Sequence, residues 1–70
     1  MLNKKSIKQK ILELLEKEFP RDFSIGEVAK QVGIARPTAS TWLKVLLAEG
    51  KIEISRKVGN AIFYRFKGER

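Results

Sequence analysis

The chain has 70 residues, lacks cysteine and histidine, and carries a formal net charge of +7 from 15 Lys and Arg against 8 Asp and Glu. Disulfides are therefore excluded, and the usual zinc ligands, catalytic bases and nucleophiles are missing, so we expect no enzyme, cofactor or metal site. The positive charge favours polyanionic partners, nucleic acid before a membrane surface, and no apolar run approaches the roughly 20 residues that span a bilayer.

A first helix is predicted from about residue 6 to residue 19. Ser6 and Gln9 have the spacing of a capping box at its start, and Pro20 ends it. One apolar stripe recurs at helical spacing and comprises Ile7, Ile11, Leu14, Leu15 and Phe19. The lysines near its start are either phosphate contacts or a solvated end: Lys4, Lys5, Lys8 and Lys10.

A second helix is predicted from about residue 25 to residue 32. Ser24 and Glu27 form a second capping box, and Phe23, just before the cap, is placed to act as a hydrophobic staple on Val28. Gly33 ends the helix because glycine readily takes the left-handed conformation.

The third helix is predicted from about residue 36 to residue 49. Pro37 lies in its first turn, where the missing N–H costs nothing, and Gly50 closes it. Its buried stripe comprises Ala39, Leu43, Leu46 and Leu47. Trp42 borders this stripe, so it either packs there, at a dimer contact for example, or contacts a DNA backbone.

The hydrophobic period then changes from 3.6 to 2, which predicts a two-stranded hairpin over about residues 52–66 with Gly59 and Asn60 at its tip. The face toward the helices comprises Ile52, Ile54, Ile62, Tyr64 and Phe66. Phe63 points to the opposite face, so it either marks a partner surface or is covered by the first helix.

This order of elements resembles the winged helix-turn-helix family of bacterial and archaeal transcription regulators. Ala29, Gly33 and Ala39 fall where the family has a small residue, a turn glycine and a buried residue. The exit from the third helix and the end of the hairpin extend the resemblance over residues 7–66: Glu49-Gly50-Lys51-Ile52 and Tyr64-Arg65-Phe66. The sequence departs from the family at Ala35, where Ser or Thr often caps the third helix. Either this change costs the helix about 1 kcal/mol, or Pro37 compensates by presetting the backbone, or Arg36 is the first residue outside the helix.

The resemblance implies an α+β, mainly α, fold class: one domain over residues 1–70, with three helices and a two-stranded β-hairpin wing. It also implies that the third helix enters the DNA major groove, while the wing follows the backbone or enters the minor groove. The outward residues of the helix are Arg36, Pro37, Thr38, Ser40, Thr41 and Lys44, and those of the wing tip are Arg56, Lys57, Gly59 and Asn60.

These residues suit different contacts. Arg36 is suited to a guanine, Thr38, Ser40 and Thr41 to base edges or phosphate, and Lys44 to the backbone. The alternative for the helix is a merely solvated face, which would favour Glu–Lys pairs, whereas residues 35–48 contain no acid. The alternative for the wing is that basic residues keep a strand edge soluble.

We therefore expect a sequence-specific binder of double-stranded DNA that regulates transcription in the cytoplasm, associated with the nucleoid. A homodimer is expected because one small module makes few specific contacts, and no membrane or small-molecule effector is expected. Two alternatives remain: a winged helix that docks other proteins, and non-specific DNA binding in the nucleoid or in replication.

Overall fold

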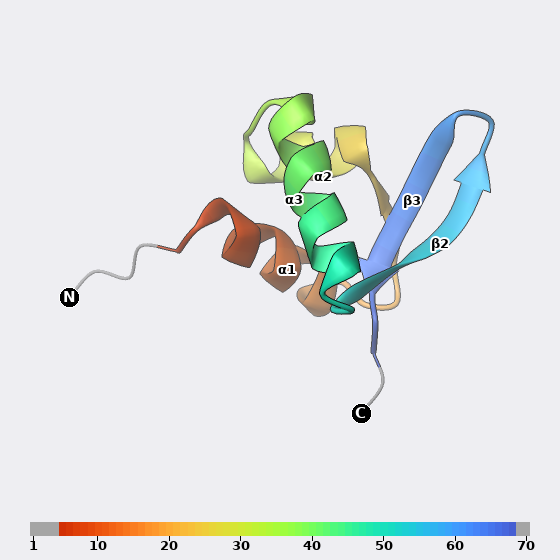
Figure 1. The fold of residues 1–70 in the computed structure, drawn as a ribbon, viewed down its shortest axis with the longest axis horizontal. Helices are drawn as coiled ribbons and strands as arrows, with labels where there is room; N and C mark the ends of the chain where they lie inside the picture. Colours follow the sequence, from red (N-terminus) through yellow and green to blue (C-terminus); the bar gives the residue numbers. More distant parts are fainter. Residues whose placement is uncertain (1–4, 69–70) are drawn as a thin grey trace.

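The computed structural model describes residues 5–68. The elements are α1 (Ile7–Lys17), β1 (Phe23–Ser24), α2 (Ile25–Val32), α3 (Arg36–Ala48), β2 (Ile52–Val58) and β3 (Ala61–Phe66). The three helices pack together and the β2–β3 hairpin projects beside them (Figure 1). Within the described residues no helix is long and apolar enough to cross a membrane. Lys4, one of the candidate phosphate contacts, lies outside the described residues.

The hydrophobic core lies where the three helices meet the base of the sheet, and every helix and strand contributes to it. Its buried members are Ile11, Leu15, Phe23, Val28, Ala29, Ala39, Leu43, Leu46, Ile52 and Tyr64. Phe23 and Val28 are both fully enclosed, as a staple at the start of α2 requires. Within residues 5–68 no polar or charged side chain other than the tyrosine is buried, and burial raises the pKa of Tyr64.

Local capping fixes the start and end of α2. The amide of Glu27 donates to Ser24 Oγ at 3.2 Å, and the amide of Ser24 donates to Glu27 Oε1 at 3.1 Å, which completes the expected capping box. Gly33 ends the helix at φ 82°. At the start of α1, Ser6 Oγ accepts from the amide of Gln9 at 3.1 Å.

Replacing Ser24 with alanine tests the contribution of this box. We expect Ser24→Ala to lower the free energy of unfolding by about 1 kcal/mol, which for a domain of this size lowers Tm by about 4–8 °C. The measurement is thermal and urea unfolding followed by circular dichroism. Ser40→Ala, a half-buried serine inside α3 and away from any helix cap, is the control; equal losses in the two variants would contradict the capping account.

The end of α1 differs from the sequence prediction. The helix ends at Lys17, and Phe19, expected in the buried stripe, is 43% exposed. Its ring instead lies edge-on to Phe66, with the ring centroids 6.1 Å apart. The reason is that Phe19 follows the helix C-cap at Glu18, so its side chain no longer continues the helical stripe. α3 stops at Ala48, one residue earlier than expected.

The sheet has three strands in the order β1-β3-β2, not only the two of the predicted hairpin. β1 pairs antiparallel with β3 through Phe23↔Tyr64 and Ser24↔Phe63. A strand of two residues has no periodicity that a sequence could display, so this strand was not predicted. Its effect is to join the segment before α2 to the base of the wing.

A register shift interrupts the β2–β3 ladder. Ile54 pairs with Tyr64, but Arg56 pairs with Phe63, so Ser55 is an extra residue in β2. Such a bulge reverses the face to which the following side chains point and bends the strand. Ile54, expected on the face toward the helices, is 50% exposed because it lies on the edge strand just where this bend begins.

Candidate nucleic-acid interface

The first half of α3 presents most of the residues that the sequence predicted as outward-facing. Arg36, Pro37, Thr41 and Lys44 are exposed, whereas Thr38 and Ser40 are half-buried. Ala35 is the N-cap and makes no side-chain hydrogen bond, because its methyl group has no acceptor atom. The backbone amides in the first turn of α3 therefore receive no hydrogen bond from an N-cap side chain.

The hydroxyl group of Thr41 makes a hydrogen bond within its own helix. Its Oγ1 donates to the carbonyl oxygen of Pro37 at 3.0 Å. The hydroxyl oxygen still has capacity to accept a hydrogen bond, and the residue is exposed. Thr41 is thus better suited to a thymine methyl or an amino group than to donating to a phosphate.

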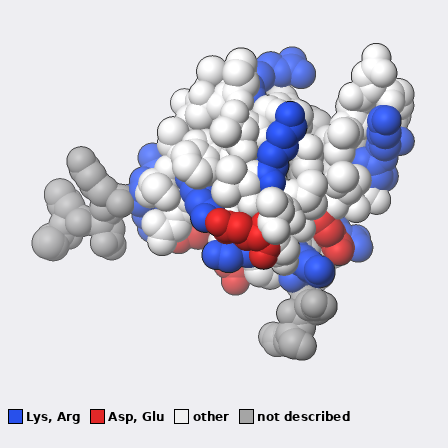
Figure 2. Space-filling view, in the orientation of Figure 1, with Lys and Arg blue, Asp and Glu red and all other residues white. Residues whose placement is uncertain are grey.

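The charges are distributed unevenly over the molecule. Residues 28–48 contain Lys30, Arg36 and Lys44 and no acid. In Figure 2 the acidic side chains of the visible face gather at its lower end, while the upper part shows only basic and uncharged side chains. Two acids of the chain are in ion pairs with lysines, at 2.6 Å for Lys8–Glu49 and 2.7 Å for Lys5–Glu13.

This pairing separates the predicted basic residues into two groups. Arg36, Lys44 and Lys57 form no ion pair with any acid of residues 5–68. Arg56 instead binds Asp22, through Nε to Oδ2 at 2.8 Å and Nη2 to Oδ1 at 3.5 Å. The guanidinium of Arg56 lowers the pKa of Asp22, with the Ser55 hydroxyl as the second cause, and the carboxylate raises the pKa of Arg56.

The start of α3 and the wing tip meet at a small cleft of about 160 Å³. Its lining residues come from β1, α2, α3, β3 and the wing turn: Ser24, Ile25, Gly26, Arg36, Asn60, Ala61 and Ile62. The guanidinium carbon of Arg36 lies 3.6 Å from the point where a β-carbon on Gly26 would be. The structure thus places Arg36 and Asn60 at the same cleft, which the sequence alone could not show. Gly26 also lines this cleft, and sequence patterns did not predict it because glycine has no side chain.

Two aromatic residues left open by the sequence have defined surroundings. Trp42 is half-buried against the core, which agrees with a packing role. Phe63 is covered by the guanidinium of Arg56, whose carbon lies 4.2 Å from the ring centroid, and not by α1 as the sequence allowed. The aromatic face of the wing is therefore already occupied by a side chain of the same chain.

Three packed helices, the second and third joined through a left-handed glycine, followed by a hairpin on a small sheet, define the winged helix-turn-helix fold, and this chain has that fold. The crystal structure of a zinc-responsive MarR family member, Lactococcus lactis ZitR, is similar with a TM-score of 0.74 and 20% identity over 96% of this chain and 46% of that chain.

In sequence, 44 residues of the chain are 46% identical to the biofilm growth-associated repressor of Xylella fastidiosa, in both strain Temecula1 and strain 9a5c. The match covers 63% of this chain and 38% of each repressor. The chain thus spans well under half the length of these relatives. No protein-family model matches it.

Proposed function

We propose that the chain binds double-stranded DNA in a sequence-specific manner and regulates transcription, with α3 in the major groove and the β2–β3 wing on the backbone or in the minor groove. The observation that carries this proposal is that α3 contains no acid, and that its Arg36 and Lys44 are exposed and have no acidic partner within residues 5–68. The repressor name of the Xylella fastidiosa relatives supports regulation and gives no support to an enzyme.

The geometry suggests a role for each part of the surface. Arg36, at the first position of α3, is suited to a bidentate contact with guanine, and Thr38, Ser40 and Thr41 to neighbouring base edges. Lys44 lies further along the helix and meets the phosphate backbone. At the wing, Lys57 and the turn at Gly59 and Asn60 contact the backbone or minor groove, where the positive φ of 60° at Gly59 keeps the turn tight.

We further propose that two copies bind one pseudo-palindromic site. A single module of this size covers few base pairs, and two recognition helices about one helical turn apart would double the specific contacts. Occupancy of a promoter by such a pair would repress transcription by excluding other proteins. No separate effector site is needed for this mechanism.

The test is DNA binding measured by fluorescence anisotropy over a salt series, with duplexes enriched by selection and with random duplexes. We expect steep salt dependence and a selected site bound at least about 1,000-fold more tightly than random DNA. Equal affinity for all duplexes would favour a non-specific nucleoid or replication role. Absence of binding at low salt would refute the proposal and favour a protein-docking winged helix.

A further inference from the structure

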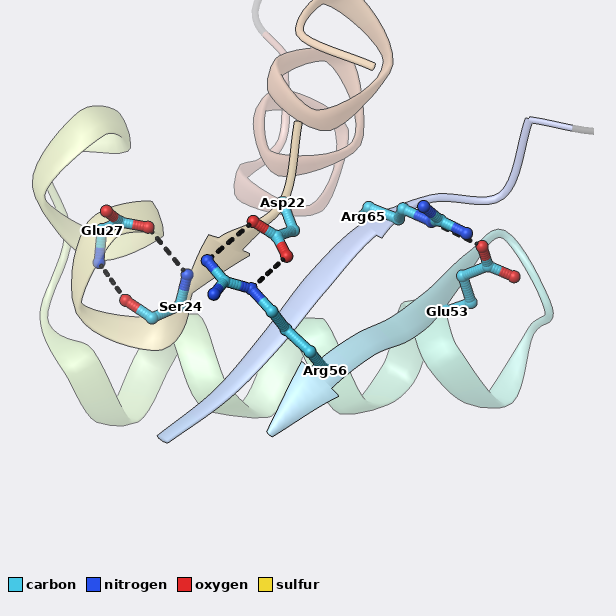
Figure 3. A network of polar contacts seen from close by, with 6 residues as sticks. All are labelled: Asp22, Ser24, Glu27, Glu53, Arg56 and Arg65. Carbon is cyan, nitrogen blue, oxygen red and sulfur yellow. Dashed lines mark hydrogen bonds and ion pairs between the residues drawn. The ribbon is translucent and has the colours of Figure 1, made fainter. Parts of the chain in front are cut away.

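The ion pair between Arg56 and Asp22 crosses the whole sheet. Arg56 lies on β2, at one edge, and Asp22 directly precedes β1, at the other edge, with β3 between them. Figure 3 shows the guanidinium of Arg56 reaching the carboxylate of Asp22. The carbon of this guanidinium lies over Phe63 of the central strand, 4.2 Å from its ring centroid. One side chain thus connects all three strands on the face of the sheet that carries Phe63.

The bulge at Ser55 makes this connection possible. In an uninterrupted ladder, the pairing of Ile54 with Tyr64 would place Arg56 opposite Ile62, on the other face of the sheet. The extra residue instead places Arg56 opposite Phe63 and leaves Lys57 opposite Ile62. Neighbouring side chains of a strand point to opposite faces, so the bulge puts Arg56, and not Lys57, on the face of Asp22.

The ion pair between Asp22 and Arg56 lies beside the short strand β1. β1 pairs with β3 only through Tyr64 and Phe63. Beyond Phe63, toward the turn, residues 57–62 of the hairpin are paired only with each other. A two-stranded ribbon alone is marginally stable, so the direction of this tip depends on what holds its base.

Arg56 is poorly placed to contact DNA without loss elsewhere. If its guanidinium moved to a phosphate, the carboxylate of Asp22, whose side chain is only 18% exposed, would lose its partner. The ring of Phe63 would also lose its cover. Lys57, one residue nearer the turn, is exposed and has no acidic partner within residues 5–68.

We propose that Asp22, Arg56 and Phe63 form a latch that fixes the direction of the wing, so that Arg56 is a positioning residue for DNA binding and not a phosphate contact. The latch holds the base of the hairpin against β1 and, through β1, against the start of α2. Lys57, Gly59 and Asn60 are thereby held in a constant position relative to α3. The consequence for affinity rests on the proposed DNA-binding function; the consequence for the order of the wing does not.

The decisive variant is Asp22→Ala, because the two roles of Arg56 predict opposite results. If Arg56 contacts phosphate, removing the acid frees the arginine and removes a negative charge, so DNA binding tightens. If Arg56 positions the wing, binding weakens, and we expect about a 5-fold loss for the selected duplex with the salt slope unchanged. Binding as tight as wild type, or tighter, would overturn the proposal.

Glu53→Ala is the matched control. Glu53 also accepts from an arginine Nε on this sheet, that of Arg65 at 2.7 Å (Figure 3). This pair lies at the base of the hairpin, and within residues 5–68 Arg65 makes no cation–π contact. The change in charge is the same as in Asp22→Ala. We expect Glu53→Ala to bind DNA as tightly as wild type or more tightly; a loss equal to that of Asp22→Ala would show that the latch has no special role.

Arg56→Lys provides a second variant that keeps the charge. Lysine still contacts a phosphate but lacks the planar fork that binds the carboxylate and lies over the ring. The latch predicts a loss similar to that of Asp22→Ala, and the double variant should be no weaker than the single ones because both break the same connection. Wild-type affinity of Arg56→Lys would contradict the latch.

Backbone order of the wing can be measured without DNA. We expect lower ¹⁵N heteronuclear NOE values and faster amide exchange at residues 57–62 in Asp22→Ala and Arg56→Lys than in Glu53→Ala. Unchanged order in both latch variants would overturn the proposal even if DNA binding changed. If the wild-type chain bound no DNA, the proposed function would fail while these measurements would still decide whether the latch exists.

Discussion

Replacing Leu43 with alanine is expected to leave most of the chain unfolded at room temperature. Leu43 is fully buried in α3, at the centre of a core to which every element contributes. Truncation of an enclosed leucine costs about 2–5 kcal/mol, and a domain this small rarely has more than about 3–5 kcal/mol of stability without staples. With no cysteine in the sequence, no disulfide can offset the loss. Urea unfolding followed by circular dichroism measures the effect.

Leu47→Ala is the control for Leu43→Ala. Leu47 lies one turn further along the same helix and is only partly buried. The same atoms are removed, but part of their surface is already in contact with water, so we expect a loss of about 1 kcal/mol. Equal losses at the two positions would show that the core is not centred on α3 as described.

Replacing Arg36 with alanine is expected to produce the largest loss of DNA affinity among the exposed residues of α3. A bidentate contact with guanine accounts for about 1–3 kcal/mol, so binding to the selected duplex should weaken by about 5- to 150-fold. Preference at one base pair should relax at the same time, and binding to random DNA should change much less. Anisotropy with selected, single-substituted and random duplexes measures all three quantities.

Lys44→Ala and Lys17→Ala serve as comparisons for Arg36→Ala. Lys44 is a proposed backbone contact, so its removal should weaken binding to selected and random DNA equally and reduce the salt slope by about 1. Lys17, on the last turn of α1, is exposed and lies outside the proposed interface. Equal weakening of specific and random binding by Arg36→Ala would assign Arg36 to the backbone, and a large effect of Lys17→Ala would place the interface elsewhere.

Features that depend only on residues close together in the chain could be predicted from the sequence. The capping box of Ser24 and Glu27 and the turn at Gly33 join residues at most four positions apart, and the stripe of Ala39, Leu43 and Leu46 follows from the geometry of one helix. At the start of α3 only Pro37 in the first turn is such a local signal, because Ala35 provides no side-chain cap. Periodicity and capping act locally, so they can be read without the fold.

Two features became visible only in the tertiary structure: the pairing of the wing with β1, and which basic residues have no acidic partner within residues 5–68. β1 is too short to show a period, and the bulge at Ser55 reverses the alternation on which the prediction for the hairpin depended. Arg56 and Asp22 are 34 residues apart, so no local pattern could pair them. By sequence, Arg56 and Lys57 belong to one basic wing tip. The structure separates them, because adjacent side chains of a strand point to opposite faces and the bulge places Arg56, not Lys57, on the face of Asp22.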